Sequence, residues 1–281
     1  MAETTRFAPS PTGRLHLGHA YSALFAADQA ADGLLRLRLE DIDRTRCRVE
    51  FEQGILEDLA WLNVQWSAPL RRQSEHLQEY EAALRRLREM ELLYPCFCTR
   101  REIAEEVKRA DRAPHGPEGP LYPGSCRRLS WSERDARIAA GEPHAWRLDM
   151  QEALRRCSQL TWRDLTAGDQ VARPEMLGDV VLARKEMPTS YHLAVVIDDA
   201  AQDVSLVTRG DDLFHATHLH RLLQELLGLP VPRWHHHSMV VDERGQRLAK
   251  RQDALSIKRL REAGYTPEEV VRLAEGAALR G

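Results

Sequence analysis

The N-terminal third alternates between two hydrophobic patterns. Two short segments, 4–8 and 35–39, have the pattern of strands, the second because Leu alternates with Arg up to Glu40. Between and after them, apolar residues recur every three or four positions, which predicts helices over 17–25, 51–62 and 77–90. A strand–helix–strand–helix order predicts a parallel sheet joined by helical crossovers.

The pattern changes after Pro95. Residues 96–128 combine three cysteines with many prolines and glycines, and we expect an irregular insertion there. Beyond it, Gly228 and Pro230 end an amphipathic helix over 219–227. Apolar runs predict further strands at 178–183, 193–197 and 204–207. The simplest architecture is an open α/β domain split by an insertion and followed by a basic C-terminal segment.

Composition narrows the class of protein. The 281 residues are 43% hydrophobic and 30% charged, which is typical of a globular chain that needs no disulfide framework. No apolar run reaches about 18 residues and the N-terminus lacks signal-peptide features, so we expect neither a membrane span nor export. Five unevenly spaced cysteines favour a cytoplasmic enzyme with thiols or a metal site. The net charge of −3 predicts no general affinity for nucleic acid, although seven basic residues gather within 244–261.

The first candidate site follows the first predicted strand. A Pro-rich turn leads into His16, Gly18 and His19 at the start of the next helix. Ligands bind at this edge of a parallel sheet, and helix N-termini attract anions. Both imidazoles can donate hydrogen bonds to phosphate oxygens, and Gly18 would let an adenine approach the backbone. A bare pair of histidines is more often a surface feature, whereas the pair after this turn is much more specific.

Other charged motifs are weaker alone. Lys250, within RLAKR at 247–251, could neutralise charge on a triphosphate as pyrophosphate leaves, or belong to a solvated basic loop. The acids at 198–199 and 211–212 could contact Mg²⁺ or ribose, or only cap helices. Three histidines at 235–237 suggest a metal tract, but neighbours on a strand face opposite ways, so we expect a loop there.

Another candidate lies in the insertion. Cys96, Cys98 and Cys126 offer three thiolates, and zinc requires a fourth ligand. His115 is the chemically commoner choice, and Tyr122 is the other candidate. The alternative is a group of buried, reduced cysteines.

Together these motifs resemble the catalytic domain of the class I glutamyl-tRNA synthetases. HLGH is similar to the HIGH signature of that family and RLAKR to its KMSKS signature, while RFAPSPTGR, LRLEDIDRTR, YHLAVVIDDA and VTRGDDL match in order. The resemblance implies a Rossmann-type parallel sheet split by a zinc-bearing insertion, with a short helical C-terminal segment like a stem-contact region. It divides the chain into the first half of the catalytic domain, the insertion, the second half, and the lysine loop with its helical segment, at 1–95, 96–175, 176–235 and 236–281.

The resemblance also assigns site residues. The expected L-glutamate site comprises Arg6, Phe7, Ala8, Pro9, Ser10, Glu40, Tyr191 and Arg209. Glu40 would hold the ammonium group, and Tyr191 and Arg209 would contact the side chain and carboxylate region, where Arg offers bidentate geometry. The expected ATP site comprises His16, Gly18, His19 and Lys250, and the two histidines and the lysine would be catalytic. Without the resemblance, Glu40 and Arg209 could equally form a structural salt bridge.

Some features depart from the family pattern. Arg247 replaces the first lysine of the lysine signature and Ala249 its serine, which keeps a charge but removes one phosphate hydrogen bond. Only 30 residues follow Arg251, too few for the anticodon-binding region of a full-length glutamyl-tRNA synthetase. In this respect the chain resembles the glutamyl-Q tRNA(Asp) synthetases, which attach glutamate to the queuosine base in the anticodon of tRNA(Asp).

That resemblance favours Tyr122 as the fourth ligand of one structural Zn²⁺. It implies activation of L-glutamate by ATP with Mg²⁺ to glutamyl-adenylate without tRNA, then transfer to tRNA(Asp) that carries queuosine. We expect a cytoplasmic monomer with no membrane contact. The alternatives are a truncated glutamyl-tRNA synthetase that charges a tRNA 3′ end, and a catalytically silent zinc-containing RNA-binding module.

Overall fold

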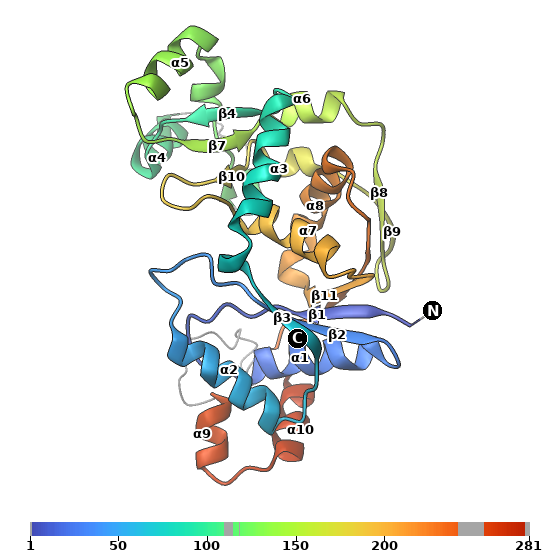
Figure 1. Ribbon diagram of the computed structural model, residues 1–281. Helices are drawn as coiled ribbons and strands as arrows, with labels where there is room; N and C mark the ends of the chain where they lie inside the picture. The colour runs from blue at the N-terminus through green and yellow to red at the C-terminus, as the bar shows by residue number, and fades with distance from the viewer. Residues whose placement is uncertain (1, 110–114, 118, 241–255, 279–281) are drawn as a thin grey trace.

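The chain folds around parallel strands that come from both halves of the sequence. The computed structural model describes residues 2–109, 115–117, 119–240 and 256–278. Three parallel strands come from the N-terminal part: β1 (Thr4–Phe7), β2 (Leu34–Leu39) and β3 (Ser67–Arg72). Two more, β11 (Leu206–Gly210) and β12 (Arg233–His237), pair in parallel further along the chain. The Ser205 amide donates to the Thr4 carbonyl over 2.9 Å, so β11 lies beside β1 and the two sets of parallel strands adjoin (Figure 1).

Helices cover these strands on both sides, with α1 and α2 below them and α7 and α8 above them in Figure 1. The helices are α1 (Leu17–Ala30), α2 (Val49–Trp61), α3 (Leu77–Glu89), α4 (Arg100–Arg109), α5 (Trp131–Ala139), α6 (Met150–Arg155), α7 (Tyr191–Ala201), α8 (Phe214–Leu227), α9 (Ile257–Glu262) and α10 (Pro267–Ala278). Short 3₁₀ turns are η1 (Gln73–Glu75), η2 (Ser125–Arg128), η3 (Pro174–Leu177) and η4 (Asp211–Leu213).

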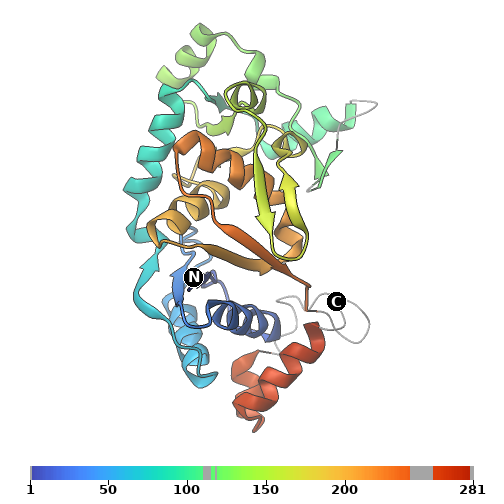
Figure 2. The same cartoon turned by 90° about the vertical axis from the view of Figure 1, so that its right-hand side faces the viewer.

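The remaining strands belong to smaller sheets or extend the pair of β11 and β12. An antiparallel sheet consists of β4 (Leu93–Cys96), β7 (Ala145–Leu148) and β10 (Val181–Ala183), and a two-stranded ladder of β5 (His115–Gly116) and β6 (Gly119–Pro120). The hairpin of β8 (Thr161–Asp164) and β9 (Gly168–Val171) pairs with β12 and runs beside α8 (Figure 2).

The C-terminal helices pack against the first helix. Val270 and Ala274 of α10 are buried in the same apolar cluster as Ala20 and Ala23 of α1, and Figure 2 shows the two helices side by side. The Ile257 amide donates to the Leu15 carbonyl over 2.9 Å. The start of α9 is therefore joined to the turn that precedes α1. Within the described residues, no helix has the length and apolar character needed to span a membrane.

The predicted parallel sheet with helical crossovers is confirmed, but the strand predicted at 193–197 is wrong. These residues lie in α7, where Ser190 accepts from the Leu193 amide as the N-cap. The helix is buried on most of its faces, since Leu193, Val195 and Asp198 are all inaccessible. An apolar run without periodicity does not distinguish a buried helix from a buried strand.

Two other predictions need correction. The loop expected at 235–237 is the end of β12, in register with 208–210 of β11. The strand alternates as strands do: His236 bonds Asp164, whereas His235 and His237 bond Gln29 and Ser22 of α1. The insertion is also less irregular than expected, because α4 occupies 100–109, ahead of the proline- and glycine-rich part.

Candidate functional site

The turn after β1 is fixed to the end of β2 by main-chain hydrogen bonds. The Glu40 amide donates to the Pro9 carbonyl, and the Arg48 amide donates to the Pro11 carbonyl, each over 3.1 Å. The Ser10 side chain is exposed and Ala8 is half-buried, whereas the Phe7 ring packs into the core. The turn can therefore offer its backbone and Ser10 to a ligand, while the Phe7 side chain stabilises the strand.

His16 and His19 cap the first helix with their own rings. His16 Nδ1 accepts from the Gly18 amide at 3.2 Å, and His19 Nδ1 accepts from the His16 amide at 3.3 Å. The ring centroids are 3.8 Å apart. Because both Nδ1 atoms are acceptors, each neutral ring carries its proton on Nε2 and can donate from there. Two N–H donors at a helix N-terminus suit phosphate oxygens.

Gly18 is required by this arrangement. A Cβ built at Gly18 would meet His16 Cε1 at 3.2 Å and Nδ1 at 3.3 Å. The sequence predicted that Gly18 admits an adenine to the backbone, and the structure adds that its missing side chain leaves room for the His16 ring. Lys250, the other predicted catalytic residue, lies outside the described residues, with the rest of RLAKR. Ser256, the first described residue after that segment, forms a β-bridge with His16.

The charged residues predicted to bind the amino acid approach one another from separate elements. Arg6 lies on β1, Glu40 follows β2, Tyr191 begins α7, and Arg209 lies on β11. The Arg209 guanidinium is 3.5 Å from the Tyr191 hydroxyl. Burial raises the pKa of Tyr191, with Arg209 and Arg6 lowering it and Glu40 raising it. All four side chains therefore act on one small volume at the carboxyl end of the sheet.

Glu40 is a carboxyl group whose surroundings disfavour its charge. Its side chain is 15% exposed and lies 3.6 Å from Arg38. Burial raises the pKa of Glu40 to about 7, although the positive charges of Arg38 and Arg6 oppose the rise. A further cation beside Glu40 would stabilise the carboxylate. The position therefore suits an ammonium group.

The two arginines of the site have different partners. Arg6 Nε lies 3.2 Å from an Asp199 oxygen, and its Nη1 donates to the Thr208 carbonyl over 2.6 Å. Arg209 is equally buried, but it donates to Thr217 Oγ1 over 2.6 Å and to His236 Nε2 over 3.2 Å. In the part of the chain that the structure describes, no carboxylate oxygen lies within 4.0 Å of Arg209. A buried guanidinium that is bonded only to neutral groups attracts an anion.

A buried ion network supports this site. Arg38 is inaccessible to solvent, and its Nη1 donates to Asp199 over 2.7 Å. Asp198 accepts from Arg71 over 2.7 Å and from Tyr80 over 2.8 Å. Asp198 and Asp199 therefore hold arginines within the protein. Sequence reasoning assigned no role to Arg38; two adjacent acids in an apolar run are the signal that buried cations must face them.

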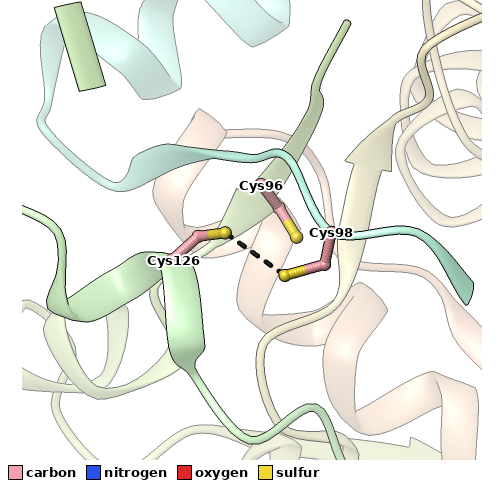
Figure 3. Close-up of side chains that lie close together, drawn as sticks. All are labelled: Cys96, Cys98 and Cys126. Atoms are coloured by element: carbon pink, nitrogen blue, oxygen red, sulfur yellow. Dashed lines mark hydrogen bonds between the residues drawn. The ribbon is translucent and has the colours of Figure 1, made fainter. Parts of the chain in front are cut away.

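The cysteines of the insertion gather into one cluster (Figure 3). The sulfur atoms of Cys96, Cys98 and Cys126 lie within 4.8 Å of one another, and those of Cys98 and Cys126 are 3.4 Å apart. Tetrahedral zinc with sulfur at about 2.3 Å places its ligand atoms about 3.8 Å apart, so the set has the right size for one ion. The Cys96 thiol and the Phe97 amide donate to the Cys126 sulfur and lower the pKa of Cys126 to about 4.

The structure places Tyr122, and not His115, beside this cluster. The Tyr122 hydroxyl lies 3.4 Å from Cys96 Sγ and 3.5 Å from Cys98 Sγ, and it accepts from the Cys126 amide over 3.0 Å. The Arg147 guanidinium stacks on the Tyr122 ring, 3.8 Å from its centroid. His115 lies on β5 and is not part of the metal-sized group found among the described residues.

Comparisons with known proteins agree with these features. Residues 3–280 match the family described as tRNA synthetases class I (E and Q), catalytic domain. The glutamyl-Q tRNA(Asp) synthetase of Rhodobacter capsulatus is 48% identical over 277 residues, which cover 96% of this chain and 98% of that protein. The one from Nocardia farcinica is 43% identical, over 95% of this chain and 82% of that protein. The crystal structure of glutamate-tRNA synthetase from Elizabethkingia anophelis has a TM-score of 0.75 and 25% identity, over 94% of this chain and 54% of that chain. The chain therefore belongs to the class I tRNA synthetases (E and Q), a family of ligases, and contains their catalytic domain.

Proposed function

We propose that this enzyme activates L-glutamate with ATP to glutamyl-adenylate without tRNA, and transfers the glutamyl group to queuosine in the anticodon of tRNA(Asp). One observation carries the choice of amino acid: Arg209 lacks a carboxylate partner among the described residues, close to a Glu40 that lacks a stable charge. An amino acid with a carboxylate side chain matches both groups at once. The ammonium would lie at Glu40, and a carboxylate would bind Arg209 and the Tyr191 hydroxyl.

The adenylation step needs no protein nucleophile. A glutamate carboxylate oxygen attacks the α-phosphorus of ATP, the bond to the β-phosphate breaks, and pyrophosphate leaves. The Nε2–H groups of His16 and His19 would donate to phosphate oxygens as their charge develops, and Lys250 would neutralise the leaving group. Mg²⁺ bound with ATP would supply further positive charge. The fixed turn over 8–11 would position the nucleotide against the amino acid.

The cysteine cluster would hold one structural Zn²⁺. Cys96, Cys98 and Cys126 would bind as thiolates, with the Tyr122 oxygen as the fourth ligand. The ion would tie the end of β4 to η2 and so order the insertion. This role is separate from the chemistry of activation.

Glutamate-dependent exchange of pyrophosphate into ATP, measured with no tRNA present, tests the activation step. Exchange with glutamate and none with glutamine or aspartate is the expected result. Exchange that requires added tRNA would refute tRNA-independent activation. Lys250→Ala tests the lysine loop, and unchanged ATP consumption in that variant would refute its role.

The acceptor needs its own experiment, because a similar solved structure, of which this chain covers 54%, is a glutamate-tRNA synthetase. Periodate opens the terminal ribose of a tRNA, which removes the 3′ acceptor. Queuosine also carries a vicinal diol, so the matched substrate is tRNA(Asp) with a 2′,3′-dideoxy end and intact queuosine. Glutamate transfer to this tRNA, and none to tRNA(Asp) without queuosine, is expected. Transfer that depends on an intact 3′ end would favour the truncated charging enzyme.

A further inference from the structure

The hydrogen bonds behind Arg209 have directions that can be assigned. A guanidinium only donates, so His220 Nδ1, which lies 3.2 Å from Arg209 Nη1, must be an acceptor. The His220 proton is therefore on Nε2, which lies 3.2 Å from His192 Nδ1. The same reasoning makes His192 Nδ1 an acceptor and places its proton on Nε2. Arg209 thus fixes the tautomers of two histidines in sequence.

His236 holds the other side of the guanidinium. Its Nε2 accepts from Arg209 Nε over 3.2 Å, so its proton is on Nδ1 and points to an Asp164 oxygen 2.7 Å away. Asp164 is itself fixed, because it also accepts from the Thr166 and Ala167 amides over 2.9 and 2.8 Å. The Asp164 carboxylate therefore orients His236, and His236 separates it from Arg209.

The two histidines that contact Arg209 do so as neutral rings. Burial lowers the pKa of His236 to about 4, with Arg209 lowering it further and Asp164 opposing. Burial also lowers the pKa of His220 well below its ordinary value, and Arg209 again contributes. A neutral acceptor fixes the direction of a guanidinium without cancelling its charge. Arg6, which is paired with Asp199, shows the other way in which this fold holds a buried arginine.

We infer that His220 and His236 are positioning residues for amino-acid binding: they orient Arg209 with neutral acceptors, so that the substrate carboxylate, and no carboxylate of the described residues, lies within salt-bridge distance of it. The inference rests on the proposed function, in which Arg209 receives a carboxylate of glutamate. It extends that function to residues that the motifs did not assign. If the two histidines only fill the core, the shape of a replacement side chain alone should determine the KM for glutamate. If they keep Arg209 without a counter-ion, the charge of the replacement should determine that KM.

The pair H220N and H220D separates these readings in the whole chain. Both side chains can place Oδ1 near the position of His220 Nδ1, and they have the same shape. We expect H220D to raise the KM for glutamate in pyrophosphate exchange by roughly tenfold to a hundredfold over H220N, because its carboxylate neutralises Arg209. The KM for ATP should change less than about twofold between the two, since the histidines at 16 and 19 are untouched. The preference for glutamate over glutamine should also fall in H220D.

Equal KM values for glutamate in H220N and H220D, with a wild type that exchanges normally, would overturn the inference. A wild type without glutamate-dependent exchange would instead refute the proposed function, and this inference with it. Thermal unfolding midpoints check that both variants fold. If position 220 does not tolerate substitution, H236Q and H236E form a second pair, in which Oε1 replaces Nε2 beside Arg209 Nε. The same contrast in KM for glutamate is expected, and its absence would equally overturn the inference.

Discussion

Glu40→Gln should make the protein more stable at alkaline pH while it disables the proposed amino-acid site. The carboxyl group has an ordinary pKa of 4.5 and a pKa of about 7 in the folded protein, chiefly because it is buried. An acid whose pKa is higher in the folded state binds its proton more tightly there. Stability is therefore lost as pH rises from about 4.5 to about 7, and the loss is complete above that range.

The size of the loss follows from the shift. A difference of about 2.5 pKa units corresponds to about 3 kcal/mol at pH 8, at 1.36 kcal/mol per unit. At pH 5 the same relation gives less than about 1 kcal/mol, because Glu40 is protonated in the folded state and partly protonated in the unfolded state. Glutamine keeps the shape without the charge, so it should recover these amounts. The expected rise in the unfolding midpoint at pH 8 is roughly 6 to 12 °C.

Urea unfolding of wild type and E40Q at pH 5 and pH 8, without substrates, measures the effect. The matched control is E89Q, which changes an exposed carboxylate at the end of α3 and should give little difference at either pH. A gain from E40Q that is equal at both pH values, or a loss at pH 8, would refute the argument that burial disfavours the charge of Glu40. In the exchange assay E40Q should raise the KM for glutamate far more than that for ATP, because only the ammonium partner is removed.

Three further predictions concern other parts of the molecule. In Gly18→Ala the new methyl group would lie 3.2 Å from His16 Cε1 and should push the ring aside. Pyrophosphate exchange should then be slower, with the unfolding midpoint nearly unchanged, and normal exchange would contradict the packing argument. Cys98→Ser should lower bound zinc below one ion per chain by elemental analysis, whereas His115→Ala should leave it unchanged; zinc loss in the latter would favour the histidine as ligand. Asp198→Asn should cost about 3–5 kcal/mol in urea unfolding, because it removes a carboxylate from buried arginines, and a cost near zero would show that the network is not stabilising.

The fold was predictable where hydrophobic periodicity is strong. The helices α3 and α8 have one apolar face: both ends of α3 were predicted to within one residue, and the end of α8 was predicted correctly, although its start at Phe214 lies five residues before the predicted one. The helix α7 was missed because burial on most of its faces removes the periodicity on which the prediction depends. β12 was missed because its histidines have different partners on the two faces of the sheet, and no local pattern reveals those partners.

The site was predictable as a set of residues but not as a network. The motifs named Arg6, Glu40, Tyr191 and Arg209, and the structure brings these four together. They could not show that Arg6 is paired with Asp199 while Arg209 is not, because those contacts join residues that are far apart in the sequence. The same applies to His220, which lies on α8, eleven residues after Arg209, and meets it only in the folded chain.

Two groups of the site, the Glu40 carboxyl and the Arg209 guanidinium, have opposite charges, and neither charge is well compensated. A cation beside Glu40 would favour its ionised form, and an anion beside Arg209 would balance a buried charge. Glutamate supplies both, so binding relieves two unfavourable states and the relief adds to its affinity. Glutamine has the same length and the same ammonium group, but its neutral amide leaves Arg209 without a counter-ion. Selectivity between the two amino acids should therefore come from the positive charge of Arg209, which the histidines do not neutralise, more than from the shape of the pocket.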